Sequence, residues 1–175
     1  SFPSAYLIAR VFKGIDIRQY GSGNVGISNV ALHVGMRGAV PLTIFDVLVK
    51  GCLPVVAASN VWLDLGLGVE ACVGAAAIIG HNWSLFLSFK GGRGMATCLG
   101  VLVTLNWPLV VLYGSVAGIG WIVTRNSAIW WGIAALLLPF WSIVLKLPFE
   151  IVWICVAFVI IIALKRLFSN PVSTR

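Results

Sequence analysis

Charge is scarce in this sequence. Only 10% of its 175 residues are Asp, Glu, Lys or Arg, and five of them are acidic, whereas an ordinary soluble domain is roughly 25% charged. Hydrophobic residues make up 60% of the chain, and the mean hydropathy is +1.03. A small soluble domain keeps much of its surface in water and could not hide so much apolar area. The composition therefore excludes an ordinary soluble protein and predicts a membrane protein.

Cysteine pairs, linkers and repeats are also missing. The cysteines lie in apolar runs without C-x-x-C spacing, so we interpret them as small buried hydrophobic side chains rather than disulfides or metal ligands. They are Cys52, Cys72, Cys98 and Cys155. Without a charged linker or low-complexity tract, we expect one integral membrane domain over residues 1–175. The opening "SFPSAYLIAR" has no Met and no charged region, so we expect the tail of a truncated membrane helix, not a complete signal peptide.

Apolar segments of membrane length recur along the chain. A helix that crosses the bilayer core needs about 20 apolar residues, with a working range of about 17 to 25. Polar residues and prolines interrupt the pattern near residues 60–64, 106–108 and 146–148. We predict spans at roughly 39–59, 67–85, 95–105 with a few more residues at each end, 108–124, 128–146 and 149–164. Residues 1–12 add a further, incomplete helix. The predicted fold class is all-α: a polytopic membrane helix bundle of about seven transmembrane helices in the complete protein.

Basic residues fall mainly on one side of this topology. Successive connections between the predicted spans lie alternately on the two sides of the membrane. In this assignment Lys50 lies within a span, and Lys146 lies on the side opposite to the other basic residues. The remaining basic residues are Arg10, Lys13, Arg18, Arg37, Lys90, Arg93, Arg125, Lys165, Arg166 and Arg175. The positive-inside rule makes their side cytoplasmic. The net charge of +7 therefore indicates topology, together with an anion or anionic membrane lipids at that face, and it requires no nucleic acid.

The string Gly21-Ser22-Gly23-Asn24-Val25-Gly26 has the G-x-G-x-x-G spacing of dinucleotide-binding turns. That fingerprint needs a strand before it, a helix after it and a parallel sheet around it. Here the flanks are "FKGIDIRQY" and membrane helices, with no β-α-β run. We therefore expect no NAD or FAD site, and we predict no cofactor and no metal.

The same glycine loop suits a phosphate. Glycine reaches positive φ and lets backbone N–H groups converge on an anion. Ser22, Asn24, Ser28 and Asn29 add neutral donors, and an arginine lies on either side of the loop. The alternative is a polar turn in which Asn and Ser side chains cap the next helix.

A second glycine-rich segment, "FKGGRGMAT" at residues 89–97, precedes the span predicted at 95–105. Helix N-termini favour anions, so cations and glycines at this point predict a phosphate site. The residues are Lys90, Gly91, Gly92, Arg93 and Gly94. The Walker A spacing is absent. The alternative is a positively charged anchor with glycines for flexibility. Both glycine segments face the same side in the predicted topology.

Polar residues also lie inside or at the end of spans. Asp46 and Lys50 are four residues apart, in the favourable order of acid before base. Charges at membrane depth usually face protein or water, so the pair is either a structural ion pair or part of the site. His81 and Asn82 end the next span, just before the second glycine segment. His81 either binds substrate or caps a loop.

Taken together, these segments resemble the bacterial acyl-phosphate-dependent glycerol-3-phosphate acyltransferase family. The opening through "GSGNVGISNV" is similar to the family's G-S-G-N-P-G-A-T-N segment, and "FDVLVKGCLPV" is similar to its Asp- and Lys-bearing helix. The segment "GHNWSLFLSFKGGRGMAT" is similar to its G-H-N and F-K-G-G-K-G-V-A-T motif. The resemblance covers nearly the whole chain and implies a truncated first helix.

The resemblance implies an enzyme of the bacterial inner membrane with its active-site loops on the cytoplasmic side. The implied reaction moves an acyl chain from acyl phosphate to sn-glycerol 3-phosphate, giving 1-acyl-glycerol 3-phosphate (lysophosphatidic acid) and phosphate for phospholipid synthesis. The family needs neither metal nor acyl-CoA. The oligomeric state and acyl-chain preference do not follow from the resemblance.

The resemblance also implies roles for particular residues. The catalytic candidates are Ser22, Asn24 and Ser28. The substrate- or phosphate-binding candidates are Gly21, Gly23, Gly26, Asn29, His81, Asn82, Lys90, Gly91, Gly92, Arg93, Gly94, Thr97 and Ser127. Ser28 and Arg93 keep the hydroxyl and the charge of the family's Thr and Lys, although an Arg differs from a Lys in shape.

At three positions the sequence lacks a polar side chain of the family pattern. Leu32 stands where the family has a phosphate-binding arginine, and Ile160 and Ala163 stand where it has His and Asn. His33 or Arg37 is a candidate to compensate for the arginine. These departures raise the alternative of a diverged, low-activity or non-catalytic paralogue that binds a phosphorylated lipid precursor. A small transporter is a further alternative, although matched broken helices are absent from the pattern.

Overall fold

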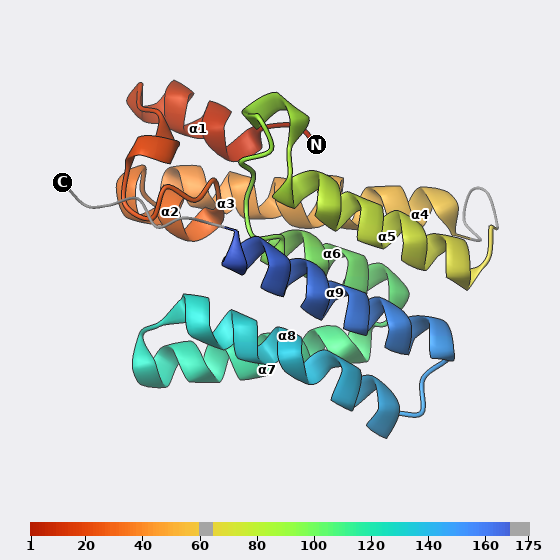
Figure 1. The fold of residues 1–175 in the computed structure, drawn as a ribbon. Helices are drawn as coiled ribbons and strands as arrows, with labels where there is room; N and C mark the ends of the chain where they lie inside the picture. Colours follow the sequence, from red (N-terminus) through yellow and green to blue (C-terminus); the bar gives the residue numbers. More distant parts are fainter. Residues whose placement is uncertain (60–64, 169–175) are drawn as a thin grey trace.

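The computed structural model describes residues 1–59 and 65–168, and within these ranges every regular element is helical. Figure 1 shows the longer helices running roughly side by side. The helices are α1 (Ser4–Lys13), α2 (Ile27–His33), α3 (Met36–Ile44), α4 (Leu53–Ala58), α5 (Leu67–Asn82), α6 (Met95–Leu105), α7 (Trp107–Thr124), α8 (Ser127–Val144) and α9 (Phe149–Leu167). The 3-10 turns η1 (Ile17–Gln19) and η3 (Leu85–Leu87) and the π-helical segment η2 (Phe45–Cys52) complete the order. The all-helical prediction is confirmed.

Each predicted span coincides with a helix, with small differences at the ends. The span predicted at 39–59 is one continuous helix, Met36–Ala58, which contains α3, η2 and α4. The span predicted to reach residue 85 ends at Asn82, and α6 does not extend beyond Met95–Leu105. Within the described residues, two helices are long and apolar enough to cross a membrane, Met36–Ala58 and Trp107–Thr124, and two shorter apolar helices are Met95–Leu105 and Ile129–Val144. The finer count of about seven spans stays a prediction.

The π-helical segment and the short helix α2 were not predicted. The apolar pattern of residues 39–59 indicates a helix but does not distinguish an α-helical from a π-helical turn. Helix α2 lies in the segment that we interpreted as a loop, and Gly26 precedes it in extended conformation. Both unpredicted elements contain candidate site residues.

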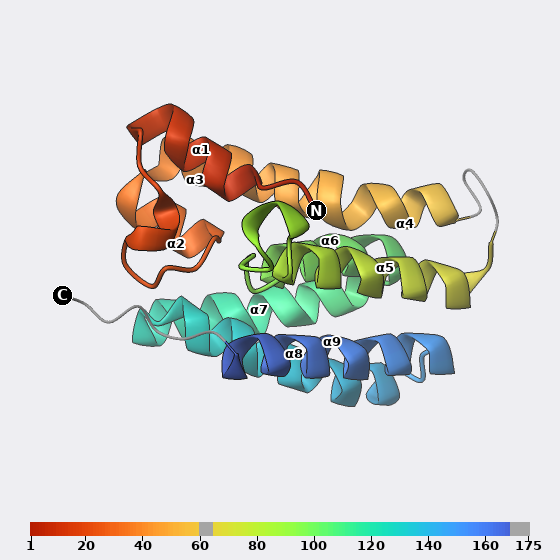
Figure 2. The same ribbon diagram turned by 45° about the horizontal axis from the view of Figure 1, so that its top comes forward.

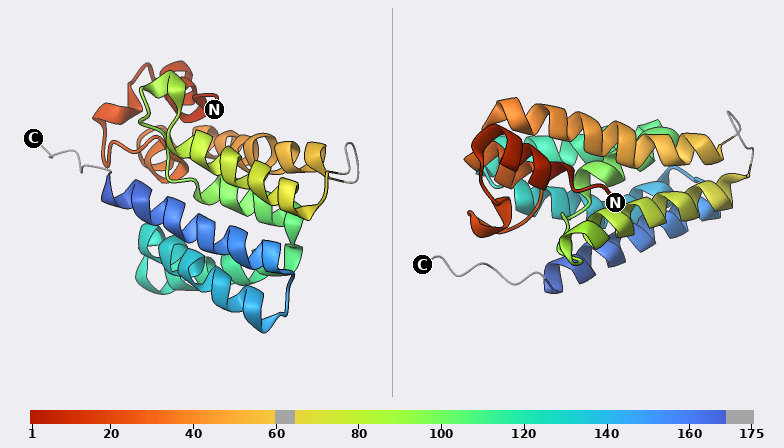
Figure 3. Two further views of the ribbon diagram at one scale, coloured as in Figure 1. Left: turned by 45° about the vertical axis from the view of Figure 1, so that its right-hand side comes forward. Right: turned by 90° about the horizontal axis from the view of Figure 1, so that it is seen from above.

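Two apolar cores hold the helices together. The larger one joins α4 to α9, with Leu102, Tyr113 and Phe158 fully buried within it. The smaller one joins α1, η1, α2 and α3 with Leu87 of the segment before α6. Figures 1 and 2 show α9 between α5 and α8, and both of these helices contact it. In Figures 1 and 3 the segment between α5 and α6 rises beside α1.

Close backbone contact joins η2 to α6. A Cβ built on Gly51 would lie 2.6 Å from the Thr97 carbonyl oxygen and 2.7 Å from Gly100 Cα. A Cβ built on Gly100 would fall on the carbonyl oxygen of Val47. Only glycine permits this approach, so the two glycines determine how closely η2 and α6 pack.

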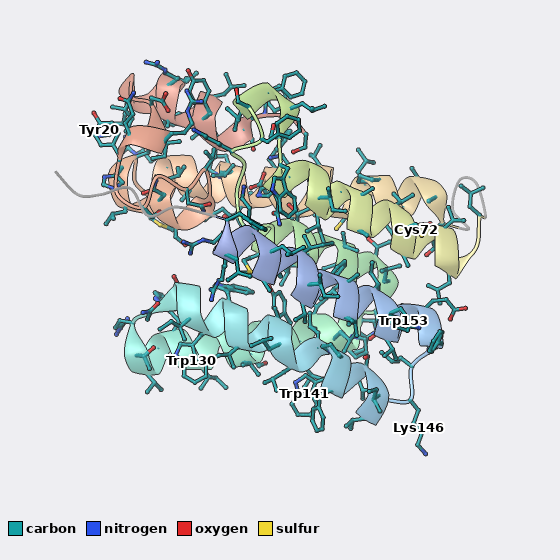
Figure 4. The ribbon with its side chains drawn as sticks, in the orientation of Figure 1. Tyr20, Cys72, Trp130, Trp141, Lys146 and Trp153 are labelled. Atoms are coloured by element: carbon teal, nitrogen blue, oxygen red, sulfur yellow. The ribbon has the colours of Figure 1, made fainter. Side chains whose placement is uncertain are left out.

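Basic residues gather at one end of the bundle. Arg10 and Lys13 lie in the last turn of α1, and Arg125 follows α7. Lys165 and Arg166 lie in the last turn of α9. Figure 4 shows Lys146 projecting at the opposite end from Tyr20. This arrangement follows the alternation predicted from the sequence, although it does not show which end faces the cytoplasm.

Large apolar side chains cover much of the surface between these ends. Ile119, Leu136 and Ile143 are 62–64% exposed. Such an apolar surface is costly in water and is typical of a lipid-facing one. Cys72 is exposed as well, contrary to the expectation that all four cysteines are buried, whereas Cys52, Cys98 and Cys155 are buried.

The close contact between η2 and α6 leads to a stability prediction. Gly100→Ala inserts a methyl group against the Val47 carbonyl, and we expect it to lower the free energy of unfolding by about 1–3 kcal/mol, as for overpacking elsewhere. Gly118→Ala in α7 is the matched control, because a Cβ there meets nothing within 4 Å; we expect no loss, or a gain of up to about 1 kcal/mol from helix propensity. Thermal unfolding of both variants in detergent checks this. Equal midpoints would contradict it.

Candidate functional site

A cavity of about 310 Å³ opens where the two glycine segments meet. Its polar wall comes from the first glycine loop, from η2, from the end of α5 and from the segment before α6. The residues of this wall are Ser22, Asn24, Gly26, Ser28, Asn29, Asp46, His81, Arg93 and Gly94. The remaining lining residues are Ile27, Thr43, Val47, Met95, Ala96, Leu99 and Trp131. The two glycine segments, which were predicted only to face the same side, therefore meet at one cavity in the structure.

The Asn29 side chain holds the first glycine loop in shape. Its amide nitrogen lies within hydrogen-bond distance of the carbonyl oxygens of Ile17, Tyr20 and Asn24, at 3.1, 2.9 and 3.1 Å. Asn29 is 4% exposed, so these bonds are largely shielded from water. The loop therefore returns on itself around the first turn of α2.

We call these three hydrogen bonds the Asn29 clamp. The alternative interpretation, in which Asn and Ser side chains of this loop cap the next helix, is wrong for α2. Gly26 caps α2, and no side chain provides a capping hydrogen bond there. The first two loop glycines, Gly21 and Gly23, have positive φ, at 53° and 65°. A Cβ on Gly21 would also collide with the side chains of His33 and Asn29. Gly21 is thus required by conformation and by packing, and neither Gly21 nor Gly23 lines the cavity.

Just before the loop, Arg18 and Asp16 form an ion pair. The Arg18 guanidinium donates to both Asp16 carboxylate oxygens, with the shortest distance at 2.7 Å. These bonds hold the pKa of Asp16 below its ordinary value. Arg18 is thereby engaged at the loop's entry and is not among the residues that line the cavity.

The second glycine segment divides between the cavity and the protein interior. Arg93 and Gly94 line the cavity, and the buried Nε of Arg93 has no hydrogen-bond partner among the described residues. Lys90 is exposed and lies outside the lining. Gly91 and Gly92 line a smaller adjoining cavity instead. Of the two cations predicted to bind phosphate, the structure therefore brings Arg93 to the cavity.

Tight packing explains the glycines of this segment. A Cβ on Gly91 or Gly92 would collide with the His81 carbonyl oxygen or with His81 Nε2. A Cβ on Gly94, which has φ +75°, would lie 2.6 Å from Asn82 Oδ1. The segment therefore folds directly onto the end of α5, so that flexibility does not explain its glycines.

Helix α6 begins at the cavity wall. Its N-cap is Gly94, without a side-chain cap, and Met95 and Ala96 line the cavity. The first backbone N–H groups of a helix have no partner within the helix. Together with Arg93, this helix end supplies donors and positive potential to one region of the cavity.

The predicted Asp46–Lys50 pair forms, and it involves two further residues. Lys50 Nζ lies 2.8 Å from Asp46 Oδ1, and the two side chains are 9% and 2% exposed. Lys50 Nζ also donates to Ser4 Oγ at 2.7 Å, and Ser4 Oγ donates to Asp46 Oδ1 at 3.0 Å. Lys50 Nζ lies 3.5 Å from His81 Nδ1. Because Asp46 and His81 line the cavity, the ion pair is both structural and adjacent to the site.

Sequence reasoning missed Ser4, which is 4% exposed. It lies in a segment interpreted only as the remainder of a membrane helix. Its signal in the sequence was a single hydroxyl in an apolar run, which is too common to single out. The ion pair that it serves lies 42 residues further along the chain.

The remaining candidate residues, Asn82, Thr97 and Ser127, differ in burial and do not line the cavity. Asn82 and Thr97 are fully buried, and neither Asn82 amide atom nor Thr97 Oγ1 has a hydrogen-bond partner within the described part of the chain. Ser127 begins α8 and does not line the cavity, whereas Trp131, four residues later on the same helix face, does. Trp131 stacks edge-on against the buried Tyr113 with ring centroids 5.1 Å apart.

No group of three or more His, Cys, Asp or Glu residues that could hold a metal ion gathers within residues 1–59 and 65–168. The cavity instead offers hydroxyl and amide groups, a guanidinium, a helix N-terminus, a carboxylate and an imidazole. This set suits an anionic ligand that also carries hydroxyl groups.

Comparison with known proteins agrees with this chemistry. The family model described as "Glycerol-3-phosphate acyltransferase" matches residues 1–170. The chain belongs to the glycerol-3-phosphate acyltransferase family. The resemblance inferred from the sequence motifs is confirmed.

Several relatives within the acyltransferase family support this assignment. Glycerol-3-phosphate acyltransferase 5 of Dehalococcoides mccartyi is 43% identical over 81% of this chain and 59% of its own length. The glycerol-3-phosphate acyltransferase of Endomicrobium trichonymphae is 36% identical over 95% of this chain and 82% of its own length. The chain spans less than two thirds of the length of several curated relatives that it matches, including the Dehalococcoides protein.

A solved acyltransferase structure shares the fold. The crystal structure of PlsY, an integral membrane glycerol 3-phosphate acyltransferase in its glycerol 3-phosphate form, superposes with a TM-score of 0.83 and 25% identity. The match covers 94% of this chain and 82% of that one. The lysophosphatidic acid form of PlsY gives a TM-score of 0.76 at 24% identity, over 93% of this chain and 84% of that chain.

The three positions that lack a polar side chain of the family pattern do not line the cavity. Leu32 is 76% exposed and Ile160 is 52% exposed, and Ala163 is also exposed. His33 packs beside Tyr20 with ring centroids 5.7 Å apart, and Arg37 is exposed. Neither of the two proposed substitutes lines the cavity.

The Asn29 clamp yields a prediction about local order. Asn29→Ala removes bonds to three loop carbonyls, so we expect amide hydrogen exchange in residues 20–26 to become at least tenfold faster, equivalent to about 1.4 kcal/mol of lost protection. Asn106→Ala is the matched control, because Asn106 caps α7 at the other end of the bundle. It should speed exchange only near residues 106–110. Unchanged exchange in the loop of the Asn29 variant would refute the clamp.

Proposed function

We propose that this chain carries the active site of an acyltransferase that moves an acyl chain from acyl phosphate to sn-glycerol 3-phosphate. The products are 1-acyl-glycerol 3-phosphate and inorganic phosphate. The observation that carries the proposal is the cavity in which Ser22, Ser28, Asp46, His81 and Arg93 meet. Family membership and the likeness to PlsY support it.

The proposed chemistry needs little from the protein beyond placement and charge. Acyl phosphate is a mixed anhydride with a good leaving group, so a covalent enzyme intermediate is unnecessary. The glycerol hydroxyl oxygen bonds to the acyl carbon, the bond from that carbon to the phosphate oxygen breaks, and the hydroxyl proton ends on the released phosphate. Holding the two anionic substrates together and neutralising their charge can supply most of the acceleration.

The cavity has groups suited to both tasks. Arg93 and the first N–H groups of α6 supply positive potential for phosphate. Ser22, Asn24 and Ser28 provide hydrogen bonds to phosphate or glycerol oxygens from the opposite wall. Asp46 supplies an acceptor for a glycerol hydroxyl.

The apolar residues that line the cavity can accommodate the acyl chain. Val47, Leu99 and Trp131 form part of the cavity beside the polar groups. We propose that the acyl chain lies along these residues among the membrane helices, and that both head groups enter from the end rich in basic residues. By the positive-inside rule that end faces the cytoplasm, in a multi-pass protein of the bacterial inner membrane with about seven spans and one domain.

An acyl-transfer assay tests the proposal. The full-length protein in detergent should convert glycerol 3-phosphate and palmitoyl phosphate to lysophosphatidic acid and phosphate, with no turnover of palmitoyl-CoA. Arg93→Ala should lower kcat/KM roughly ten- to hundredfold, because one charge-assisted hydrogen bond contributes about 1.5–3 kcal/mol. Ser22→Ala should lower it about tenfold. Arg125→Ala, a change at the exposed end of α7, is the control and should leave the rate unchanged.

A diverged paralogue is the alternative raised by Leu32, which stands where the family resemblance implies an arginine. Leu32→Arg distinguishes the two functions. If the site is active, the substitution should change kcat/KM by less than about tenfold, because residue 32 does not line the cavity. Glycerol 3-phosphate binding without turnover in the wild type, with turnover appearing in Leu32→Arg, would instead establish the paralogue.

A further inference from the structure

Lys50 has a complete set of hydrogen-bond acceptors. Its ammonium group carries three N–H donors and no acceptor. These donors face Asp46 Oδ1 at 2.8 Å, Ser4 Oγ at 2.7 Å and His81 Nδ1 at 3.5 Å. The partner of the ammonium group is therefore a buried carboxylate.

This arrangement determines which nitrogen of His81 carries a proton. An ammonium group can only donate, so the 3.5 Å contact is a hydrogen bond only when Nδ1 presents its lone pair to Lys50. In a neutral imidazole the proton then resides on Nε2. A doubly protonated ring would instead place a second N–H donor and a second positive charge against Lys50.

Nε2 lies on the side of the ring that faces the second glycine segment. A Cβ on Gly92 would collide with this atom, so the ring edge lies directly against the backbone next to Arg93. His81 also lines the cavity that contains Arg93. His81 Nε2 therefore lies against the backbone of Gly92, and the same cavity is lined by Arg93, the residue proposed to bind phosphate.

We propose that Lys50 holds His81 as the neutral Nε2–H tautomer, so that His81 donates a hydrogen bond to an anionic phosphate oxygen instead of taking a proton as a general base. Ser4 acts as a positioning residue, because it orients Lys50, and Asp46 orients Lys50 in addition to facing the cavity. The identity of the oxygen rests on the proposed function, whereas the tautomer does not. A donor prepared in this way requires no protonation change during acyl transfer.

Nitrogen NMR of the full-length protein in detergent tests the tautomer directly. The sequence has two histidines, so His33→Gln leaves His81 as the single ¹⁵N-labelled histidine. We expect a protonated Nε2 and an unprotonated Nδ1. Predominance of the Nδ1–H form would overturn the proposal, whether or not any other variant folds.

A double variant tests the role of Lys50. Asp46→Asn combined with Lys50→Met removes both charges, so that neither is left buried and unpaired. We expect the Nε2–H preference to weaken at least tenfold toward a mixture of tautomers. An unchanged tautomer ratio in the folded double variant would show that Lys50 does not set it.

Kinetics separate a donor from a base. Glutamine can donate through its side-chain amide but cannot accept the hydroxyl proton, so His81→Gln should keep kcat/KM within about threefold, whereas His81→Leu should lower it roughly ten- to hundredfold. Equal losses of about 10²–10⁴ in both variants, typical of a removed general base, would overturn the donor role. If the wild type shows no turnover, the proposed function fails while the NMR result still decides the tautomer.

Ser4 has its own kinetic test. Ser4→Ala removes one acceptor for Lys50 and one donor to Asp46, and we expect kcat/KM to fall about tenfold with partial loss of the Nε2–H preference. Ser4→Thr keeps the hydroxyl and should restore both. Failure of threonine to restore either quantity, or a rate loss with an unchanged tautomer, would show that Ser4 serves only in packing.

Discussion

The buried ion pair between Asp46 and Lys50 is the interaction on which the arrangement of the site depends. A charge removed from water is costly unless it is paired and hydrogen-bonded. The pair achieves this only by drawing in Ser4 from α1 and His81 from α5. The segment that carries it, η2, therefore cannot shift along its neighbours without leaving a charge unsatisfied. The polar network fixes the positions of α1, η2 and α5 relative to one another. Apolar packing alone would define these positions less precisely.

Glycine provides the second constraint, through close packing. Gly51 and Gly100 bring η2 against α6, and Gly91 and Gly92 bring the second glycine segment against His81. Where two backbones approach this closely, any side chain would separate them. The glycine-rich segments therefore draw the cavity walls together, whereas the polar side chains that line the cavity come both from these segments and from η2 and α5. Asn29 acts similarly in the first loop, because its amide is occupied by three carbonyls.

Much of the helical framework could be predicted from the sequence. Membrane helices are long apolar segments that end at polar residues and prolines, so local composition locates them. The predicted 95–105 and 108–124 segments correspond closely to α6 and α7. The π-helical turn and α2 could not be predicted in this way, because they depend on packing with distant segments. The exposure of Cys72 was also mispredicted, since an apolar run does not reveal which face of a helix is buried.

For the site, the sequence by itself determined the chemical groups: two glycine segments with basic and hydroxyl residues, an acid and a base four residues apart, and a histidine at a helix end. It also established the family, because motif order is a property of the chain alone. The tertiary structure decided which of these groups meet. It brought Arg93 to the cavity and left Lys90 exposed, and it added Ser4 to the ion pair. The physical reason is that such contacts join residues many positions apart, and their distances arise only when the helices pack.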